Sequence, residues 1–304
     1  MLFILVSLFI LGLLVGSFLN VVICRIDTGE GFLLSHSHCP HCGHRLAWYD
    51  LIPLVSFVLL RARCRYCKKN ISYQYPLVEA VTGILFIFSF LSVFDEFHLF
   101  LVSDIENSLL PLFLARLGFF LFLSSLLIIV AVYDTKQSLI LDEFIIVGVL
   151  GTLLFYILML LMNGGWIIIE KLELYWGTLF PFRSIDLPQV LIEPLSTFLP
   201  VIAGIGAAGF FLFLVFLTAG RGMGGGDVKF AFLLGLILGW PEILLAVFLA
   251  FLTGAIVGVM LILRKKKNLK ETIPFGPFLA LGTLITLYWG RYIVLWYFTQ
   301  RVSL

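Results

Sequence analysis

LFLARLGFFLFLSSLLIIVAV, residues 112–132, is the stretch that decides the fold. A helix that crosses the hydrocarbon core of a membrane needs about 20 predominantly apolar residues, and this run has that length. Arg116, near its beginning, is its one charged residue, and Tyr133 and Asp134 follow its end directly. The run therefore predicts a membrane-spanning helix with an acidic side chain at its far end.

Seven further apolar runs predict further spans, so we expect about eight in total. They lie at residues 2–22, 77–94, 144–162, 199–219, 228–241, 243–263 and 275–297. The run at 228–241 is short and is divided from the next by Trp240-Pro241-Glu242, so seven spans is the main alternative. The first run lacks a small-residue cleavage site, which predicts a retained helix rather than a secretory signal.

The composition of the whole chain agrees with a membrane location. Hydrophobic residues make up 61% of the 304 residues and charged residues 12%, against about 45–50% and about 25% in soluble domains. So few polar side chains cannot cover the surface of a water-soluble globule, and disorder is excluded for the same reason. The net charge of +2 gives no indication of a nucleic-acid partner. We therefore predict an all-α polytopic protein surrounded by a lipid bilayer.

The basic residues are distributed unevenly between the two sides of the predicted bundle. Fifteen of the 20 Lys and Arg residues lie in the loops on one side, at residues 23–76, 133–143, 220–229 and 264–274. Because cytoplasmic loops carry an excess of Lys and Arg, we expect these loops in the cytoplasm and both chain termini outside it.

The stretch between the first two spans is the one soluble-looking insertion in the sequence. It carries two C-x-x-C pairs, Cys39 with Cys42 and Cys64 with Cys67, separated by 21 residues. Two such pairs can place four thiolates around a tetrahedral Zn²⁺ ion, and cytosolic thiols stay reduced rather than forming disulfides. A structural zinc site is therefore expected, because so short a segment buries little core of its own.

Two readings of the cysteines remain open beside a four-thiolate zinc site. The thiols can be reduced and unliganded, or one pair can act in redox chemistry without a metal. The first pair is also surrounded by His36, His38, His41 and His44, so a histidine can replace one cysteine as a ligand. Cys24, at the end of the first span, is expected to be a small packing residue.

Asp134 and Asp227 are the candidate catalytic residues. Asp134 follows the third span, and Asp227 ends the run Gly222-Met-Gly-Gly-Gly-Asp227 before the sixth, so the predicted topology places both on the cytoplasmic side. Ionisable residues at membrane depth are costly and are functional candidates by default. Two neighbouring carboxylates share a proton, so one can activate water while the other supports a carbonyl oxygen, as in aspartic proteolysis. Glycines before Asp227 permit close backbone approach and positive φ.

Other roles remain possible for these acidic residues. Asp227 can cap the helix that follows it, Asp134 can be solvated at a helix end, and the pair can coordinate ions in a transporter. Asp142 is expected to be the N-cap of the fourth span. Glu79 lies about one turn inside the second span and is a candidate for a substrate, cofactor or loop-arginine contact.

The order of the sequence blocks resembles the bacterial type IV prepilin peptidases, bifunctional leader peptidase/N-methyltransferases of the G-x-G-D aspartic protease group. Six blocks carry the resemblance over nearly the whole chain. They are Gly12–Asn20 with the following Val21–Arg25, the two cysteine pairs, Tyr75–Glu79, Asp134 to Asp142, Gly222–Lys229, and Pro274–Phe278. Six blocks in order are far more specific than any one of them.

The resemblance implies that Asp134 and Asp227 are the catalytic pair and that Gly224 and Gly226 form the G-x-G. It implies cleavage of prepilins and pseudopilins after the glycine that ends their basic leader, at the cytoplasmic face of the bacterial inner membrane. It further implies methylation of the new N-terminus with S-adenosylmethionine, for which the sequence shows no Rossmann-type fingerprint. Gly224, Gly226, Lys229 and Glu79 become candidate substrate or cofactor contacts, as does Arg221.

The resemblance also implies a division into three parts. These are the first transmembrane helix (1–24), the cytoplasmic four-cysteine zinc-binding insertion (25–75) and the membrane-embedded aspartic peptidase domain (76–304). The chain departs from the family pattern at Leu141, usually proline, at Ala62, commonly glycine, and after Arg221, where a glutamate is often found. Ala62 and the absent glutamate weaken the case for methyl transfer more than that for proteolysis.

Three alternative functions differ from this one in class. A peptidase without methyltransferase activity would cleave the leader and transfer no methyl group. A presenilin-like protease would also use Tyr-Asp and G-x-G-D, but it should carry Pro-Ala-Leu where this chain has Pro274-Phe-Gly-Pro. An ion-coupled transporter would use the same aspartates and cleave nothing.

Overall fold

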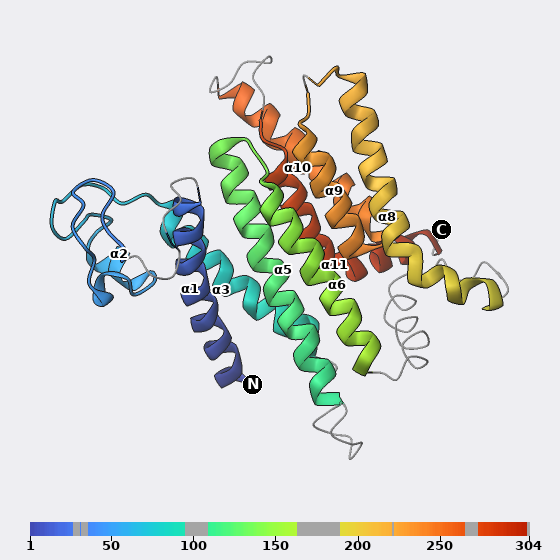
Figure 1. Cartoon of the computed structure of the whole chain (residues 1–304), viewed down its shortest axis with the longest axis horizontal. Helices are drawn as coiled ribbons and strands as arrows, with labels where there is room; N and C mark the ends of the chain where they lie inside the picture. Colours follow the sequence, from blue (N-terminus) through green and yellow to red (C-terminus); the bar gives the residue numbers. More distant parts are fainter. Residues whose placement is uncertain are drawn as a thin grey trace. The chain divides into compact units, whose positions relative to one another are not determined.

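The protein is all-α in the part that the computed structural model describes, which is residues 1–26, 31, 36–94, 109–162, 189–220, 222–264 and 273–302 (Figure 1). Between α1 and α3 lie the short 3₁₀ helix η1 (Trp48–Asp50) and α2 (Val55–Leu59). The longer helices are α1 (Leu2–Arg25), α3 (Gln74–Ser92), α5 (Leu109–Gln137), α6 (Asp142–Met162), α8 (Gln189–Leu217), α9 (Gly225–Leu238), α10 (Glu242–Leu263) and α11 (Gly276–Val302).

A helix occurs at each of the eight predicted spans, which confirms the predicted fold class. Six of these helices are long and apolar enough to cross a membrane: α1, α3, α5, α6, α8 and α10. The other two are α9 and α11. With 14 residues α9 is about 21 Å long, less than the hydrocarbon core of about 30 Å. The total of eight spans therefore stays a prediction.

The chain divides into two compact units. The first comprises Met1–Asp104 and Phe120–Ile129, and the second Ile105–Phe119 and Val130–Leu304. The first unit thus contains α1, the insertion and α3, whereas the second contains α6 to α11. The predicted division into segments 1–24, 25–75 and 76–304 stays a prediction.

In the first unit, α1 and α3 cross at small residues. A Cβ atom added at Gly12 would lie 2.6 Å from the Cα of Gly83, and one at Gly16 would lie 2.7 Å from the Cα of Glu79. Small side chains let the backbones of membrane helices approach closely, where packing rather than the hydrophobic effect drives association. The glycines of the first sequence block therefore set the position of α3, including that of Glu79.

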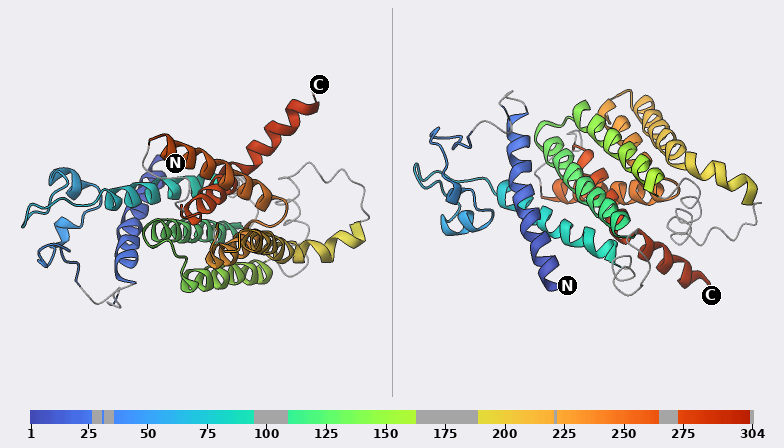
Figure 2. Two further views of the ribbon diagram at one scale, coloured as in Figure 1. Left: turned by 90° about the horizontal axis from the view of Figure 1, so that it is seen from above. Right: turned by 60° about the horizontal axis from the view of Figure 1, so that its bottom comes forward.

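In the second unit, α9 is the central helix and contacts α6, α8, α10 and α11. It lies alongside α8 in both Figure 1 and Figure 2, and a Cβ atom at Gly235 would lie 2.6 Å from the Cα of Gly204 in α8. Phe230, Ala231 and Leu234 are fully buried. A helix that is apolar on all sides is expected to be buried, and this burial fixes the position of Asp227 in its first turn.

Candidate active site

Asp134 lies in the last turn of α5 and is buried. Its Oδ2 atom accepts a hydrogen bond of 3.0 Å from the backbone N–H of Gly276, the first residue of α11. A Cβ atom at position 276 would lie 2.6 Å from the same oxygen, so only glycine permits the carboxylate to reach this backbone donor. The role of Gly276 was not predicted from the sequence, although it lies in the block Pro274–Phe278.

Asp227 is the third residue of α9 and is half-buried. Its Oδ2 atom accepts a hydrogen bond of 3.2 Å from the backbone N–H of Gly224, the N-cap residue. This is the backward-reaching half of a capping box, in which the third helical residue satisfies the N–H of the cap. The capping role considered from the sequence is therefore present. Among the described residues, the hydrogen bond from Gly224 engages one of the two carboxylate oxygens of Asp227.

Both aspartates lie in the second unit and influence each other electrostatically. Asp227 lies outside the six helices that can span a membrane, and burial and the negative charge of Asp134 raise its pKa to about 6, against the opposing effect of the Gly224 N–H. Two negative charges near each other repel, so ionisation of one carboxyl group disfavours ionisation of the other. The pair therefore forms one electrostatic unit.

Contact between the first turn of α9 and the turn between α5 and α6 brings the segments of the two aspartates near each other. A Cβ atom at Gly226 would lie 3.2 Å from the Cβ of Ile140, in the turn between α5 and α6. The glycine run thus packs against the segment that follows Asp134. The prediction of positive φ was wrong for these glycines, because Gly224 has φ −87° and Gly226 is not among the residues with positive φ. What they permit is close approach.

Lys229 and Asp142 form an ion pair between the beginnings of α9 and α6. The Nζ atom lies 2.7 and 2.8 Å from the two carboxylate oxygens of Asp142, the first residue of α6. Both side chains are more than half exposed, and exposed pairs contribute only about 0–1 kcal/mol. The pair thus links the segments that follow Asp134 and Asp227 without a large effect on stability. Arg221 lies outside the described residues.

Glu79 lies in the first unit and has a structural partner. Its Oε2 atom accepts a hydrogen bond of 2.8 Å from the backbone N–H of Leu54. Leu54 has φ 58° and ψ −47°, a conformation disfavoured for a residue with a side chain. Glu79 therefore joins the insertion to α3 and holds the strained backbone before α2.

The four cysteines of the insertion form one cluster. The Sγ atoms of Cys39, Cys42, Cys64 and Cys67 all lie within 4.8 Å of one another, and that of Cys39 lies 3.9 Å from that of Cys67. Four sulfurs at the Zn–S distance of about 2.3 Å would be separated by about 3.8 Å in a tetrahedron. The donor set and its spacing thus fit a structural zinc ion.

The two cysteine pairs have the same backbone geometry. The N–H of Cys39 donates to the carbonyl of His44, and that of Cys64 donates to the carbonyl of Lys69. In each turn the residue four positions after the first cysteine has positive φ: 68° at Gly43 and 60° at Lys68. Backbone N–H groups of Cys67 and Tyr66 lower the pKa of the Cys64 thiol to about 7, which favours the thiolate that a metal requires.

Asp50 connects η1 to the second pair of cysteines, a role not predicted from the sequence. Its carboxylate lies 2.7 Å from Nε of Arg65 and accepts a hydrogen bond of 3.1 Å from the hydroxyl of Tyr66. Although burial opposes it, the hydrogen bonds from Arg65, Ala47 and Tyr66 hold the pKa of Asp50 below its ordinary value. Both Arg65 and Tyr66 lie between Cys64 and Cys67, so Asp50 supports the metal-binding turn.

The other residues near the cysteines make separate contacts. His36 pairs with Arg45 through its Nδ1 atom, and the His44 ring packs on that of Tyr66 with centroids 3.7 Å apart. No histidine joins the four sulfurs among the described residues. Cys24 is exposed, so its prediction as a packing residue was wrong, and its Sγ atom lies 3.6 Å from the hydroxyl of Tyr75.

Two cavities in the described part of the chain differ in their lining. One of about 410 Å³ is lined by aliphatic residues of α6, α8 and α9 with Phe232 and the cation Lys229. A second, of about 370 Å³, is lined mainly by Arg and Lys side chains of the insertion. The sulfonium cation of S-adenosylmethionine favours acidic or aromatic neighbours, and of these the two linings contain only Phe232.

Comparison with known proteins identifies two family models along the chain. The Bacterial Peptidase A24 N-terminal domain matches residues 10–93, and the Type IV leader peptidase family matches residues 121–259. No solved structure matches the chain.

Curated relatives match nearly the whole chain. One from Burkholderia pseudomallei (strain 1026b) is 30% identical over 92% of this chain and 84% of its own length. One from Bacillus subtilis (strain 168) is 29% identical over 97% and 98%, and one from Aeromonas hydrophila is 29% identical over 96% and 93%. Each is named "Prepilin leader peptidase/N-methyltransferase".

The geometry of the cysteine cluster predicts one bound zinc ion per chain. Replacement of Cys39 and Cys42 by serine removes two thiolates, so we expect the loss of about one zinc ion per chain. Elemental analysis of the purified protein measures this. Cys24→Ser is the matched control, because Cys24 lies outside the cluster, and it should retain the metal. Absence of zinc from the native protein, or its retention in the double variant, would contradict the assignment.

Proposed function

The chain belongs to the type IV leader peptidase family, and we propose that it is an aspartic endopeptidase that removes the basic leader from type IV prepilins and pseudopilins. The interaction between Asp134 and Asp227 is the observation that carries this proposal. Relatives of this chain are named for both leader cleavage and N-methylation. The substrate is thus a membrane-anchored pilin-like protein, cut after the glycine that ends its leader.

Two interacting carboxylates supply the groups that peptide-bond hydrolysis requires. Because like charges at short range cannot both ionise readily, the pair carries one proton near neutral pH. The ionised carboxylate accepts a proton from a water molecule, which attacks the scissile carbonyl carbon. The protonated carboxyl group donates a hydrogen bond to the carbonyl oxygen as negative charge develops on it. The proton taken from water is then passed to the nitrogen of the departing amine, so the pair again carries one proton.

Backbone N–H groups keep both carboxylates in position during this cycle. Asp134 accepts from Gly276 and Asp227 from Gly224, each through Oδ2. Each Oδ1 atom has no hydrogen-bond partner among the described residues, so it is available to water or substrate. The exposed Gly225, whose Cβ position has no atom within 4 Å, leaves space beside the pair for an extended peptide.

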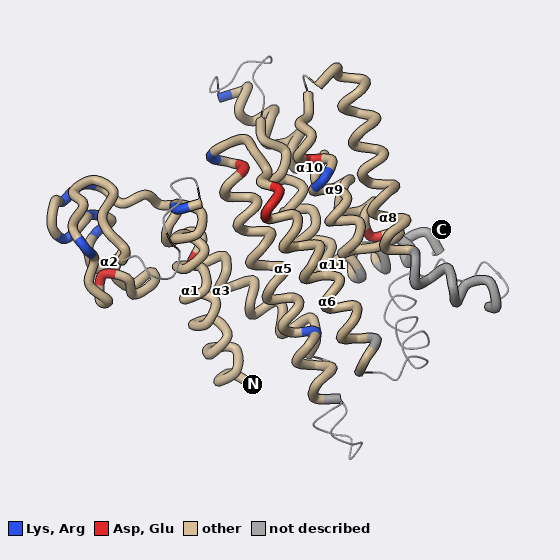
Figure 3. The backbone as a smooth tube through the Cα atoms, in the orientation of Figure 1, with Lys and Arg blue, Asp and Glu red and all other residues tan. Residues whose placement is uncertain are grey.

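The proposed location is the cytoplasmic side of the bacterial inner membrane, with both termini outside the cytoplasm. The distribution of Lys and Arg supports this orientation, and Figure 3 shows many of the basic residues gathered on the insertion between α1 and α3. The insertion and its four thiols would then lie in the reducing compartment, where thiolates remain available to zinc.

Methyl transfer to the new N-terminus is the second proposed activity and rests on the family relationship. The amine freed by cleavage has a pKa of about 8, so a neutral fraction able to attack a methyl group is present near neutral pH. Because no acidic side chain lines either described cavity, a peptidase without methyltransferase activity is the second candidate. Incubating the purified protein with a synthetic prepilin and a labelled methyl donor distinguishes the two, since only the bifunctional enzyme labels the cleaved product.

The aspartic mechanism predicts that Asp134→Asn and Asp227→Asn each abolish leader cleavage. Each variant removes a proton acceptor or donor, so we expect the cleavage rate to fall by about 10²–10⁴-fold. Glu143→Gln is the matched control, because Glu143 is an exposed carboxylate in the first turn of α6, and it should cleave at the native rate. Native cleavage in either aspartate variant, with the protein folded in the membrane, would exclude the mechanism.

The contact between Gly276 and Asp134 predicts that Gly276→Ala impairs cleavage. The new Cβ atom would lie 2.6 Å from Oδ2 and would displace the carboxylate. A shift of about 1 Å can reduce the rate about 100-fold. Gly258→Ala in α10 is the control, because its Cβ atom would meet nothing closer than 3.8 Å. Equal cleavage rates in the two variants, measured on the same synthetic prepilin, would show that Gly276 does not position Asp134.

A further inference from the structure

The insertion exposes an apolar segment that its own core does not cover. Val58 and Leu59 of α2 are 70% and 76% exposed, and Val55, one helical turn earlier, is 50% exposed. Leu51 and Ile52, directly before α2, are also exposed. Five exposed apolar side chains within nine consecutive residues are more than scattered surface residues and favour an interaction surface.

Hydrogen bonding fixes this segment beside the beginning of a membrane-spanning helix. The N–H of Leu54, the residue before α2, donates to the carboxylate of Glu79. Glu79 is the sixth residue of α3, one of the helices able to span a membrane, so five residue steps place it about 7.5 Å along the helix. The Phe57 ring also packs on Tyr73, with centroids 5.5 Å apart. Hence α2 starts at the depth of the membrane interface rather than beyond it.

An exposed apolar side chain also lies in the first turn of α3. Leu77, the fourth residue of this helix, is 64% exposed, as expected for a side chain that faces lipid.

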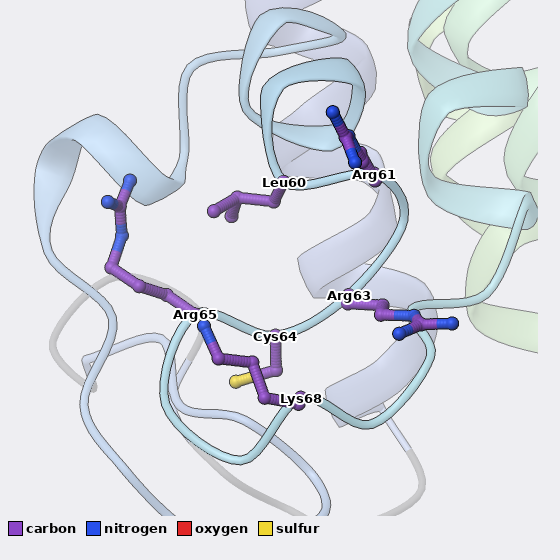
Figure 4. Close-up of a pocket in the computed structure, with 6 residues that line it drawn as sticks. All are labelled: Leu60, Arg61, Arg63, Cys64, Arg65 and Lys68. Carbon is purple, nitrogen blue, oxygen red and sulfur yellow. The ribbon is translucent and has the colours of Figure 1, made fainter.

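A basic cavity directly follows the apolar segment. It has a volume of about 370 Å³ and is lined by Leu60, Arg61, Arg63, Cys64, Arg65 and Lys68. Figure 4 shows that the side chains of Arg61 and Arg63 point away from Cys64 in different directions. Arg65 is engaged with Asp50. Arg61, Arg63 and Lys68 are exposed and have no acidic partner within the described residues. Three uncompensated cations on one surface are suited to separate anionic oxygen groups such as the phosphates of several headgroups.

We propose that residues 51–68, the interfacial segment, dock on the membrane leaflet that borders them, with the apolar residues of α2 among the acyl chains and Arg61, Arg63 and Lys68 on the headgroup phosphates of anionic phospholipids. Apolar side chains combined with Lys and Arg are the combination by which interfacial helices bind anionic membranes. Trp48, 77% exposed in the preceding 3₁₀ helix, belongs to the residue type enriched at this interface. Both ends of the insertion enter membrane helices, so the leaflet is always within reach. The proposal does not depend on the peptidase assignment.

Lipid retention by the full-length, zinc-loaded protein tests the basic half of the proposal. The protein is extracted from membranes that contain phosphatidylglycerol, and native mass spectrometry counts the bound lipids in Arg61→Gln/Arg63→Gln and in Arg45→Gln/Lys136→Gln. The control pair removes the same charge outside the cavity. We expect about 25-fold weaker phosphatidylglycerol binding in the first variant, because each basic residue near an anionic surface contributes about five-fold. Equal retention in the two variants, at equal zinc content, would overturn the proposal.

Photocrosslinking tests the apolar half. A benzophenone amino acid is placed at Leu59, in α2, or at His41, an exposed residue between the first two cysteines, and the protein is irradiated in phosphatidylglycerol nanodiscs. Adducts with acyl chains are expected at Leu59 and not at His41. Lipid adducts at both positions, at neither, or a protein adduct in native membranes at Leu59 would overturn the proposed docking surface.

Discussion

The two aspartates occupy positions that backbone hydrogen bonds and glycine contacts determine. Asp134 reaches the N–H of Gly276 because position 276 has no Cβ atom, and Asp227 reaches the N–H of Gly224 because it is the third residue of a helix that Gly224 caps. Contact between Gly226 and Ile140 holds the beginning of α9 against the turn between α5 and α6. Three helix ends, those of α5, α9 and α11, thus converge on one pair of carboxylates, and the proposed chemistry depends on that convergence.

The insertion uses different forces to reach a defined structure. Its described residues form no large apolar core, so the expected zinc ion, the Asp50 contacts and the Glu79 hydrogen bond replace one. Ala62 has φ 58°, a conformation that costs less for glycine. The neighbouring Arg61 and Leu54 also have positive φ. This strain lies on both sides of α2, and the carboxylate of Glu79 holds Leu54, the residue before α2, in place.

Much of the fold was predictable because membrane helices depend on one strong signal. Apolar runs predicted the approximate positions of the seven longer helices and of the shorter α9. The paired C-x-x-C spacing predicted the cluster of four sulfurs. Gly276 and Asp50 were not predicted, because a hydrogen bond between residues 142 positions apart in the chain leaves no local pattern. The prediction of positive φ in the glycine run was wrong for a related reason. A glycine in a sequence can indicate either a positive φ or a close neighbour that leaves no room for a side chain, and the sequence alone does not distinguish the two. Glu79 was noticed as an unusual charge, yet its partner is a backbone N–H that no sequence pattern marks.

The coupling between the two carboxylates is the central claim, and the titration of Asp227 measures it most directly. Aspartate labelled with ¹³C at the carboxyl carbon reports this pKa by NMR in the native protein and in Asp134→Asn. Burial and, to a smaller extent, the negative charge of Asp134 raise the pKa of Asp227 to about 6, so removing that charge should lower it while leaving the effect of burial. An unchanged pKa in the variant would show that the two aspartates do not act as one pair.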